Sequence, residues 1–530
     1  MTRRESEDRG EQVSNGYQPA SDQEGLSSGA DLAGARLAHI AVRSTFWVGL
    51  GSYLNQIIGF SAVLVMTRLF SPEIFGYFSL GTFWSSLLNL RPKVGLHYAA
   101  INEPKTDGTL LGTYLVIDVI VALLSMILSL IASLVLWAAG YAREVSITLL
   151  VLVTFDSLAA VFGPLSMVLE KELQLSRLAL VTLIASVVAY SCAIAMALSG
   201  MGIRALLAIN GLMMVVSMVG IVWTCYCRFP QLFVWKWDFS SEVAYRLLRR
   251  GIPVGLSLTA LSAVFNQFDN FLIGTFVGYS VLGYYDRAYR IATWPHLLLT
   301  MVIGRVAFVT FAKVKQDRPR LTYAVRLSLW VLLALGIPIV LTLFFGARDI
   351  VTILYGPAWL ASIPFLKFLT LYAFIWPIVN LGLWLSVALG HSRVSVKLTL
   401  AQAVTLVAVA TPLTLWLGVI GTLIGVAATM LLALSLSLRY IFTQLPLSAH
   451  DALLVPCLAG TLTAALMSSV TMWSKLEQLS PLMRLVAIGV SCSGVFFGLL
   501  YILRPAETSD RFRYLWRRLV TRSAEWGNSR

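Results

Sequence analysis

The chain has 530 residues, of which 58% are hydrophobic and only 12% are charged, whereas soluble domains carry about 25% charged residues. Its apolar runs are long and continuous, so the sequence predicts an all-α integral membrane protein and excludes a transmembrane β-barrel. The net charge of +14 lies mainly in loops between the apolar runs, a distribution typical of membrane proteins that argues against a nucleic-acid partner.

The first thirty residues are polar and lack an apolar period, so they are expected to be disordered and cytoplasmic. Residues 31–43 resemble a short interfacial helix and close this N-terminal region, 1–43. Candidate membrane spans follow, each about as long as a bilayer crossing requires. The fourteen spans are 44–69, 75–101, 109–137, 147–170, 174–199, 203–225, 251–277, 282–311, 321–346, 360–389, 393–416, 418–441, 451–473 and 482–503.

The loops between these spans differ in charge on the two sides of the membrane. Loops on the N-terminal side are rich in Lys and Arg, as in Arg246, Arg249 and Arg250, whereas the opposite loops carry far fewer, such as Arg143. The positive-inside rule therefore predicts that both termini lie in the cytoplasm. The bias alternates at every loop, which independently supports an even number of spans.

A long basic connection, 226–250, divides the chain and is interpreted as a cytoplasmic hinge. It separates a first lobe of six spans, 44–225, from a second lobe of six spans, 251–441. Two further spans occupy 442–503, and the tail 504–530 is predicted to form a basic amphipathic helix on the inner leaflet.

A weak internal repeat supports the two-lobe division. In the first half, Leu54-Asn55-Gln56 is followed by Gly76-Tyr77-Phe78, with 21 positions from Asn55 to Gly76. In the second half, Phe265-Asn266-Gln267 is followed by Gly283-Tyr284-Tyr285, with 17 positions from Asn266 to Gly283. Because six spans per copy is an even number, the two copies should be parallel and related by an axis along the membrane normal. The predicted fold is two pseudo-symmetric six-helix lobes plus two C-terminal helices.

Polar residues inside the spans are the candidates for function. A charged residue at a helix centre costs about 2.5–3.5 kcal/mol on insertion scales, so such residues normally face a bundle interior or a wet cavity. The most polar stretch is the hairpin 265–290, where Asp286 opens a span that also holds two arginines. Snorkelling to the interface, and mutual pairing such as Asp269 with Arg290, are the alternatives left open. The full candidate set is Asn55, Gln56, Arg91, Lys93, Asn266, Gln267, Asp269, Asn270, Arg287, Arg290, Arg305 and Lys367.

Several motifs of catalysis do not occur in the sequence. It contains no G-x-x-x-x-G-K-[ST], no H-E-x-x-H and no G-x-S-x-G, and the five cysteines include only a bare Cys225-x-Cys227. We therefore expect no enzyme activity, no cofactor and no metal site.

Two segments resemble a known family. VMTRLFSPEIFGYFSL (65–80) resembles the R-L-x-P-x-x-F-G signature of the polysaccharide transporter family, the oligosaccharide flippases of the multidrug/oligosaccharidyl-lipid/polysaccharide exporter superfamily, and LGYYDRAYRIATWP (282–295) resembles its counterpart in the second half. The resemblance implies a V-shaped pair of lobes, a central cavity lined by spans 1, 2, 7 and 8, and a place in the bacterial inner membrane. It implies that Arg91 and Arg290 match the cavity arginines of related lipid II flippases. The first-span arginines of that subfamily have no counterpart here, which argues against a strict lipid II role.

The implied cargo is an oligosaccharide on undecaprenyl diphosphate, moved from the cytoplasmic to the periplasmic leaflet by alternating access for exopolysaccharide, lipopolysaccharide O-antigen or capsule synthesis. Arginine offers bidentate donors to phosphate, and amide side chains suit sugar hydroxyls. Polysaccharide polymerase and export proteins are expected partners, and the identity of a coupling cation or proton stays open. The alternatives are a multidrug-type antiporter, which should have an acidic cavity, and a membrane polymerase or ligase, which needs a larger outer loop than the roughly ten residues found here.

Overall fold

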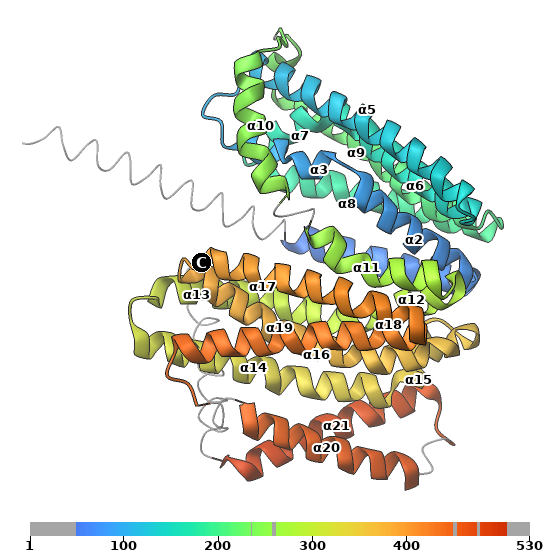
Figure 1. Cartoon of the computed structure of the whole chain (residues 1–530), viewed down its shortest axis with the longest axis vertical. Coiled ribbons are helices and arrows are strands. Elements are labelled where there is room, and N and C mark those ends of the chain that lie inside the picture. Colours follow the sequence, from blue (N-terminus) through green and yellow to red (C-terminus); the bar gives the residue numbers. More distant parts are fainter. Residues whose placement is uncertain (1–48, 235, 257–260, 449–452, 474–477, 506–530) are drawn as a thin grey trace, which may run out of the picture.

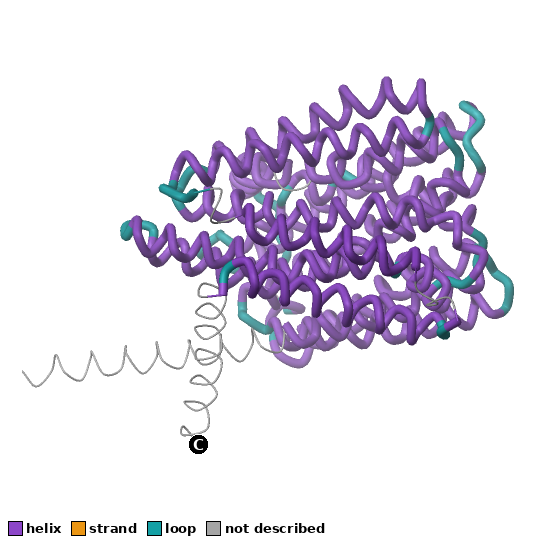
Figure 2. The backbone as a smooth tube through the Cα atoms, turned by 90° about the horizontal axis from the view of Figure 1, so that it is seen from below, coloured by secondary structure: helices purple, strands orange, loops and turns teal. Residues whose placement is uncertain are grey.

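The structure is a computed structural model that describes residues 49–234, 236–256, 261–448, 453–473 and 478–505. All regular structure in these residues is helical, with no strand among them. Figure 1 shows two groups of long helices, with a separate pair of helices beside the second group, and Figure 2 shows that most of these helices run side by side.

The first lobe begins with the helix Gly49–Leu69 and continues through α9. Its second span is broken into three pieces, because Asn89 and Leu90 interrupt the helix and Gly95 adopts a left-handed conformation. The elements are α2 (Pro72–Leu88), α3 (Arg91–Val94), α4 (Leu96–Ile101), α5 (Gly108–Ala138), α6 (Arg143–Leu158), α7 (Gly163–Lys171), α8 (Leu175–Leu198) and α9 (Ile203–Arg228).

The second lobe runs from α11 to α19 and also contains a broken span. The helix α12 includes Pro295 and is followed by a π-helical turn, Thr300–Gly304, before α13. Its elements are α11 (Leu261–Phe276), α12 (Tyr279–Leu299), α13 (Arg305–Val314), α14 (Arg318–Phe345), α15 (Ala347–Leu354), α16 (Ile363–Ala388), α17 (Ser392–Thr405), α18 (Thr411–Leu417) and α19 (Val419–Gln444).

The last two helices, α20 (Val455–Trp473) and α21 (Pro481–Leu503), pack on α14 outside the second lobe (Figure 1). Arg484 of α21 forms an ion pair with the buried Asp349 of α15, with Nε 2.8 Å from the carboxylate. The appendage predicted from the sequence is therefore joined to the second lobe.

The basic connection contains α10 (Ser241–Gly255), which packs against α3, α4 and α5 of the first lobe. Gly251 and Gly255 lie so close to the backbone of residues 93–95 that a Cβ on either would overlap it. This close contact makes α10 part of the first lobe. The part of the predicted cytoplasmic hinge that α10 covers is therefore packed on the first lobe.

The predicted spans agree well with the helices, and two of the four exceptions share a cause. Ten helices in the described part of the chain are long and apolar enough to cross a membrane. The second, seventh, eighth and thirteenth predicted spans do not meet that criterion. The second and eighth are broken and carry charges, features that transporters use where a helix lines a site rather than lipid.

The two lobes meet through a reciprocal contact between α2 and α12. A Cβ on Gly76 would overlap the carbonyl oxygen of Tyr279, and a Cβ on Gly283 would overlap that of Pro72. Each glycine therefore meets the residue four positions before its counterpart, as a two-fold relation requires. The Gly-Tyr-aromatic repeat marks the point where the lobes cross, and glycine is needed there because the backbones touch.

Candidate functional site

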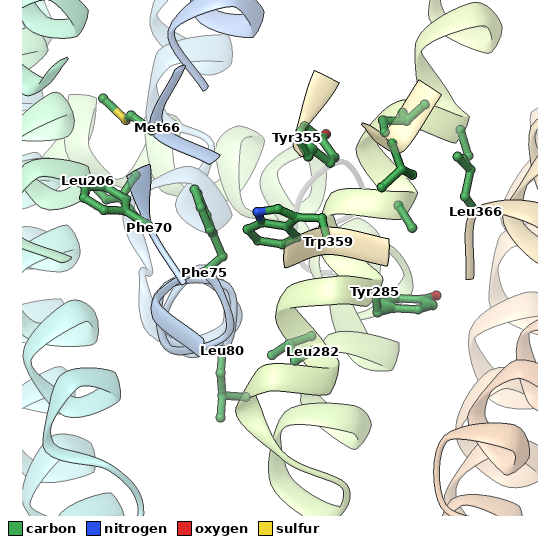
Figure 3. Packing of buried hydrophobic residues seen from close by; sticks show 14 of the residues in the cluster. Met66, Phe70, Phe75, Leu80, Leu206, Leu282, Tyr285, Tyr355, Trp359 and Leu366 are labelled. Atoms are coloured by element: carbon green, nitrogen blue, oxygen red, sulfur yellow. The ribbon is translucent and has the colours of Figure 1, made fainter. Parts of the chain in front are cut away.

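Four aromatic side chains and one arginine lie at the α2–α12 crossing and hold the lobes together. We call this cluster the lobe junction (Phe75, Tyr284, Arg287, Tyr355 and Trp359). Trp359 is fully buried, with its ring 5.6 Å from that of Phe75 and 5.8 Å from that of Tyr284. Figure 3 shows Trp359 between Phe75 on one side and Tyr355 on the other.

Hydrogen bonds to backbone carbonyls reinforce this contact between the lobes. The indole Nε1–H of Trp359 donates to the carbonyl oxygen of Thr67 at 2.8 Å. Arg68, at the end of the first helix, donates from Nε to the carbonyl oxygen of Leu354 at 3.1 Å and from Nη2 to that of Ile353. The first helix is therefore tied to the end of α15, and the molecule is closed at this end.

Next to the junction, α12 carries an aspartate whose single carboxylate oxygen accepts hydrogen bonds from two arginines. Asp286 Oδ2 accepts hydrogen bonds from Arg287 Nε at 3.0 Å and from Arg290 Nε at 3.2 Å, and it also accepts one from Arg287 Nη2. The side chain of Arg287 is only 2% exposed, whereas that of Arg290 is 49% exposed. These neighbouring arginines therefore occupy different environments.

Arg290 lies on the face of α12 that meets the first lobe. Trp294, one turn further along α12, places the centre of its ring 3.9 Å from that of Phe60 in the first helix. Eleven residues separate Tyr279, the start of α12, from Arg290, which is about 16 Å at 1.5 Å per residue. A hydrocarbon core is about 30 Å thick, so Arg290 would lie near its middle in a helix that starts at the membrane surface.

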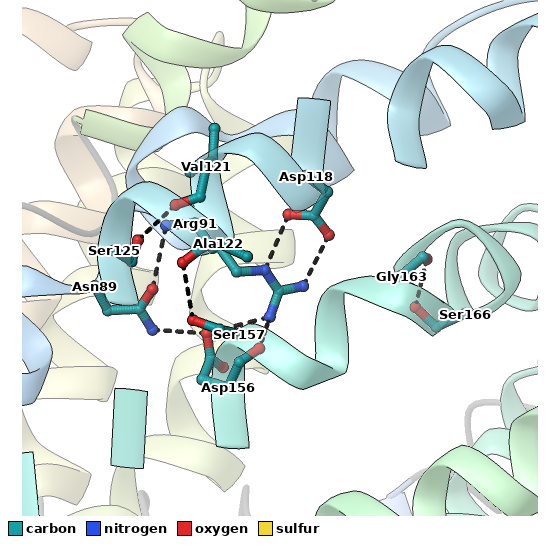
Figure 4. A network of polar contacts seen from close by, with 10 residues as sticks. All are labelled: Asn89, Arg91, Asp118, Val121, Ala122, Ser125, Asp156, Ser157, Gly163 and Ser166. Carbon is teal, nitrogen blue, oxygen red and sulfur yellow. Dashed lines mark hydrogen bonds and ion pairs between the residues drawn. The ribbon is translucent and has the colours of Figure 1, made fainter. Parts of the chain in front are cut away.

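Arg91 lies at the break in the second span and is held inside the first lobe (Figure 4). Its Nε and Nη2 donate to the two carboxylate oxygens of Asp118 at 2.9 and 2.8 Å, and its Nη1 lies 3.2 Å from Asp156 Oδ2. Asn89 also donates to Asp156, at 2.7 Å. Two carboxylates thus compensate one guanidinium that is 14% exposed. This network stabilises the broken helix, and the same lobe supplies all of its charges.

Asp269 of α11 is buried, and its partner is not the arginine considered from the sequence. Tyr285 donates its hydroxyl to Asp269 Oδ2 at 2.6 Å, and the backbone N–H of Asn270 donates to Oδ1 at 2.9 Å. A small pocket beside Asp269 is lined by Tyr289, Tyr372 and Thr429, among others. Arg290 pairs instead with Asp286.

The other predicted residues are spread over several elements. On the first helix Asn55 is half-buried and Gln56 exposed, and on α11 Gln267 and Asn270 are half-buried. Asn55 Oδ1 and Gln267 Oε1 are buried atoms without a hydrogen-bond partner among the described residues.

Three cations and one amide complete the set. Lys93 donates to the carbonyl oxygen of Leu87, and the exposed Lys367 lies with Nζ 5.4 Å from the centre of the Phe344 ring. The side chains of Asn266 and Arg305 lie outside the described part of the structure.

Sequence reasoning missed the residues that join the lobes. Trp359 and Arg68 were not candidates, because their partners are backbone carbonyls far away in the chain. The only local signal was the signature at 65–80, which contains Arg68 and Phe75.

Comparison with known proteins identifies the family. A family model described as "Polysaccharide biosynthesis protein" matches residues 65–364, more than half of the chain. The chain belongs to this family. It is a multi-pass membrane protein and a transporter of the polysaccharide biosynthesis class rather than an enzyme, so the polymerase or ligase alternative is wrong.

Relatives and solved structures agree with this assignment. An uncharacterized membrane protein in the cps region of Klebsiella pneumoniae is 22% identical over 394 residues, 72% of this chain and 78% of that protein. The succinoglycan biosynthesis transport protein ExoT of Rhizobium meliloti is 25% identical over 340 residues, 63% of this chain and 66% of its own length. The fold is similar to that of the lipid II flippase MurJ in an inward closed conformation, with a TM-score of 0.68 at 15% identity over 86% of this chain and 98% of MurJ.

A multidrug resistance transporter of the MATE family, of the MOP superfamily, in an inward-facing conformation gives a TM-score of 0.58 at 18% identity, over 73% of this chain and 94% of that chain. These likenesses show the two-lobe transporter fold predicted from the sequence.

Proposed function

We propose that the protein is a flippase that moves undecaprenyl-diphosphate-linked oligosaccharide units from the cytoplasmic to the periplasmic leaflet by alternating access, for the synthesis of a surface polysaccharide. The observation that carries this proposal is Arg290, a half-exposed guanidinium eleven positions into α12, on the face that meets the first lobe. The match to a polysaccharide biosynthesis family supports the class of cargo.

The chemistry of a diphosphate suits this residue. Its negative charges cannot enter hydrocarbon without compensation. A guanidinium gives two parallel charge-assisted hydrogen bonds to phosphate oxygens. Arg290 is better placed for this than Arg91 or Arg287, because those two are largely buried and already paired. Asn55 and Gln267 add buried amide oxygens without partners that suit sugar hydroxyls.

The closed lobe junction supports alternating access. If both termini are cytoplasmic, as the loop charges predict, the junction lies at the periplasmic side. Figure 1 shows the ribbons of the two lobes meeting at α2 and α12 and diverging toward the opposite end. In this proposal the structure is the inward-facing state, the lobes 44–225 and 251–441 rock against each other, and α10 moves with the first lobe.

The remaining assignments are also part of the proposal. The protein lies in the bacterial inner membrane, with a polysaccharide polymerase and export proteins as partners and a cation or proton as the coupling ion.

A complementation assay in a deletion strain tests the cargo site. Arg290→Ala should abolish surface polysaccharide while leaving the amount of protein in the membrane unchanged, because Arg290 is half-exposed and the buried Asp286 keeps Arg287 as its partner. Lys397→Ala removes an exposed cation of α17 that is outside the candidate set, and it should leave export intact. Full export by Arg290→Ala would remove this residue from the site.

The deletion strain should also accumulate one undecaprenyl-linked oligosaccharide on the inner leaflet, which lipid analysis would identify. Reporter fusions at Gly200 and Lys236 should lie in opposite compartments, periplasm and cytoplasm respectively. The reverse pattern would invert the proposed direction of access.

A further inference from the structure

The charged cluster on α12 is unbalanced, because one carboxylate serves two guanidinium groups. All three hydrogen bonds from Arg287 and Arg290 end on the same oxygen, Asp286 Oδ2. The three side chains together carry one net positive charge within the membrane-spanning part of the molecule. Arg290 reaches Asp286 through Nε alone, so an anion that binds Arg290 either displaces Asp286 from Nε or binds the remaining N–H groups and weakens the attraction between Arg290 and Asp286.

The second arginine depends on the opposite lobe. The guanidinium carbon of Arg287 lies 4.2 Å from the centre of the Phe75 ring of α2, a cation–π contact across the lobe junction. The Nη1 atom of Arg287 is buried without a hydrogen-bond partner among the described residues. Phe75 therefore stabilises a charge that Asp286 compensates only in part.

We propose that Asp286 is a shared counter-ion that couples anion binding at Arg290 to the contact between the lobes at Arg287. The inference rests on the proposed function and extends it. When a phosphate group takes Arg290, Asp286 pairs with Arg287 alone. The buried charge of Arg287 is then balanced, and its contact with Phe75 contributes less to stability. Asp286 is a positioning residue in this scheme, because it does not touch the cargo.

The coupling has the direction that a transporter requires. Linkage between two binding events is reciprocal, so a cargo that weakens the Phe75–Arg287 contact lowers the free energy needed to separate the lobes there. An empty carrier keeps Arg287 dependent on Phe75 and stays closed at the junction. Loss of Phe75 should, by the same linkage, strengthen anion binding at Arg290.

Pyrophosphate affinity in the full-length protein, reconstituted in nanodiscs, tests this inference. Phe75→Leu should lower the Kd for inorganic pyrophosphate about fivefold, the factor expected for loss of a buried cation–π contact. Phe70→Leu is the matched control, since Phe70 lies in the same apolar cluster with its ring 6.1 Å from that of Phe75. It should leave the Kd unchanged.

Two further variants move the affinity in opposite directions. Arg287→Met leaves Asp286 to Arg290 alone, so pyrophosphate should bind more weakly than in the wild type. The double variant Asp286→Asn/Arg287→Met removes a buried ion pair together, a change that proteins often tolerate. It frees Arg290 and should lower the Kd about tenfold, an effect typical of one charged hydrogen bond. A general packing defect could not produce both shifts.

The double variant also provides the decisive comparison. Phe75→Leu should have no further effect in the Asp286→Asn/Arg287→Met background. If Phe75→Leu changes the Kd equally in both backgrounds, or does not change it in the wild type, the coupling is overturned. The anion site still stands in that case if Arg290→Gln abolishes binding. If the wild type binds no pyrophosphate, or Arg290→Gln binds it equally well, the anion site of the proposed function fails and the coupling fails with it.

Discussion

The indole of Trp359 offers a direct test of what keeps the lobe junction closed. Trp359→Phe preserves an aromatic ring against Phe75 and Tyr284 but removes the N–H that donates to the Thr67 carbonyl oxygen at 2.8 Å. A hydrogen bond of this kind contributes about 0.5–1.5 kcal/mol net, and an unpaired buried carbonyl adds to the loss. Because 1.4 kcal/mol corresponds to a factor of ten, the open population should rise about tenfold.

A buried thiol at the junction reports that population. Thr67 is fully buried, and its backbone carbonyl is retained in Thr67→Cys. In a background whose five native cysteines are replaced, the purified protein should react with a polar maleimide only when the junction opens. The labelling rate then follows the open fraction if closing is faster than labelling.

The expected result is labelling about ten times faster in Trp359→Phe than in the parent. Trp223→Phe is the matched control, because Trp223 lies exposed on α9 and outside the lobe junction, where Trp359 is buried. If Trp359→Phe labels at the parental rate, this hydrogen bond does not hold the lobes, and their closure has to be explained by apolar packing and by the hydrogen bonds of Arg68.

Two other changes separate the crossing point from the network in the first lobe. Gly76→Ala or Gly283→Ala places a methyl group against a backbone carbonyl of the other lobe, so either should block closure and reduce polysaccharide export in the complementation assay, whereas Gly494→Ala meets no atom within 4 Å and should export normally. Arg91→Gln leaves Asp118 buried without its bidentate partner, so it should destabilise the first lobe by about 3–5 kcal/mol, seen as a lower thermal midpoint and less protein in the membrane; normal stability with lost export would instead assign Arg91 to the cargo site.

Much of the architecture could be predicted because it depends on local patterns. Long apolar runs predict spans directly, and the fourteen predicted spans correspond to helices or to chains of short helices. The Gly-Tyr-aromatic repeat supported the two-lobe division, and the structure adds that its glycines, Gly76 and Gly283, lie where the lobes cross, because only glycine permits their contact with the opposing backbones. The breaks in the second and eighth spans were not predicted, because polar residues such as Asn89 and Arg91 lower the hydropathy without showing that the helix ends there.

The candidate site was less predictable because similar residues differ only through distant partners. Arg91 and Arg290 are both arginines in broken spans, and local sequence gives no reason to separate them. The separation comes from Asp118 and Asp156, which lie 27 and 65 positions from Arg91 and compensate its charge within one lobe. Arg290 has only a shared carboxylate four residues away and stays half-exposed.

A transporter needs both kinds of arginine. A compensated one such as Arg91 stabilises a broken helix, and an exposed one such as Arg290 can bind an anion during transport. Asp286 pairs with both Arg287, which contacts the lobe junction, and Arg290, which lies on the face of α12 proposed to bind the anion. The pyrophosphate measurements and the thiol labelling therefore examine the two ends of one mechanism. If cargo binding and lobe separation are linked there, pyrophosphate should also accelerate labelling at Thr67→Cys, and the Asp286→Asn/Arg287→Met variant should abolish that acceleration.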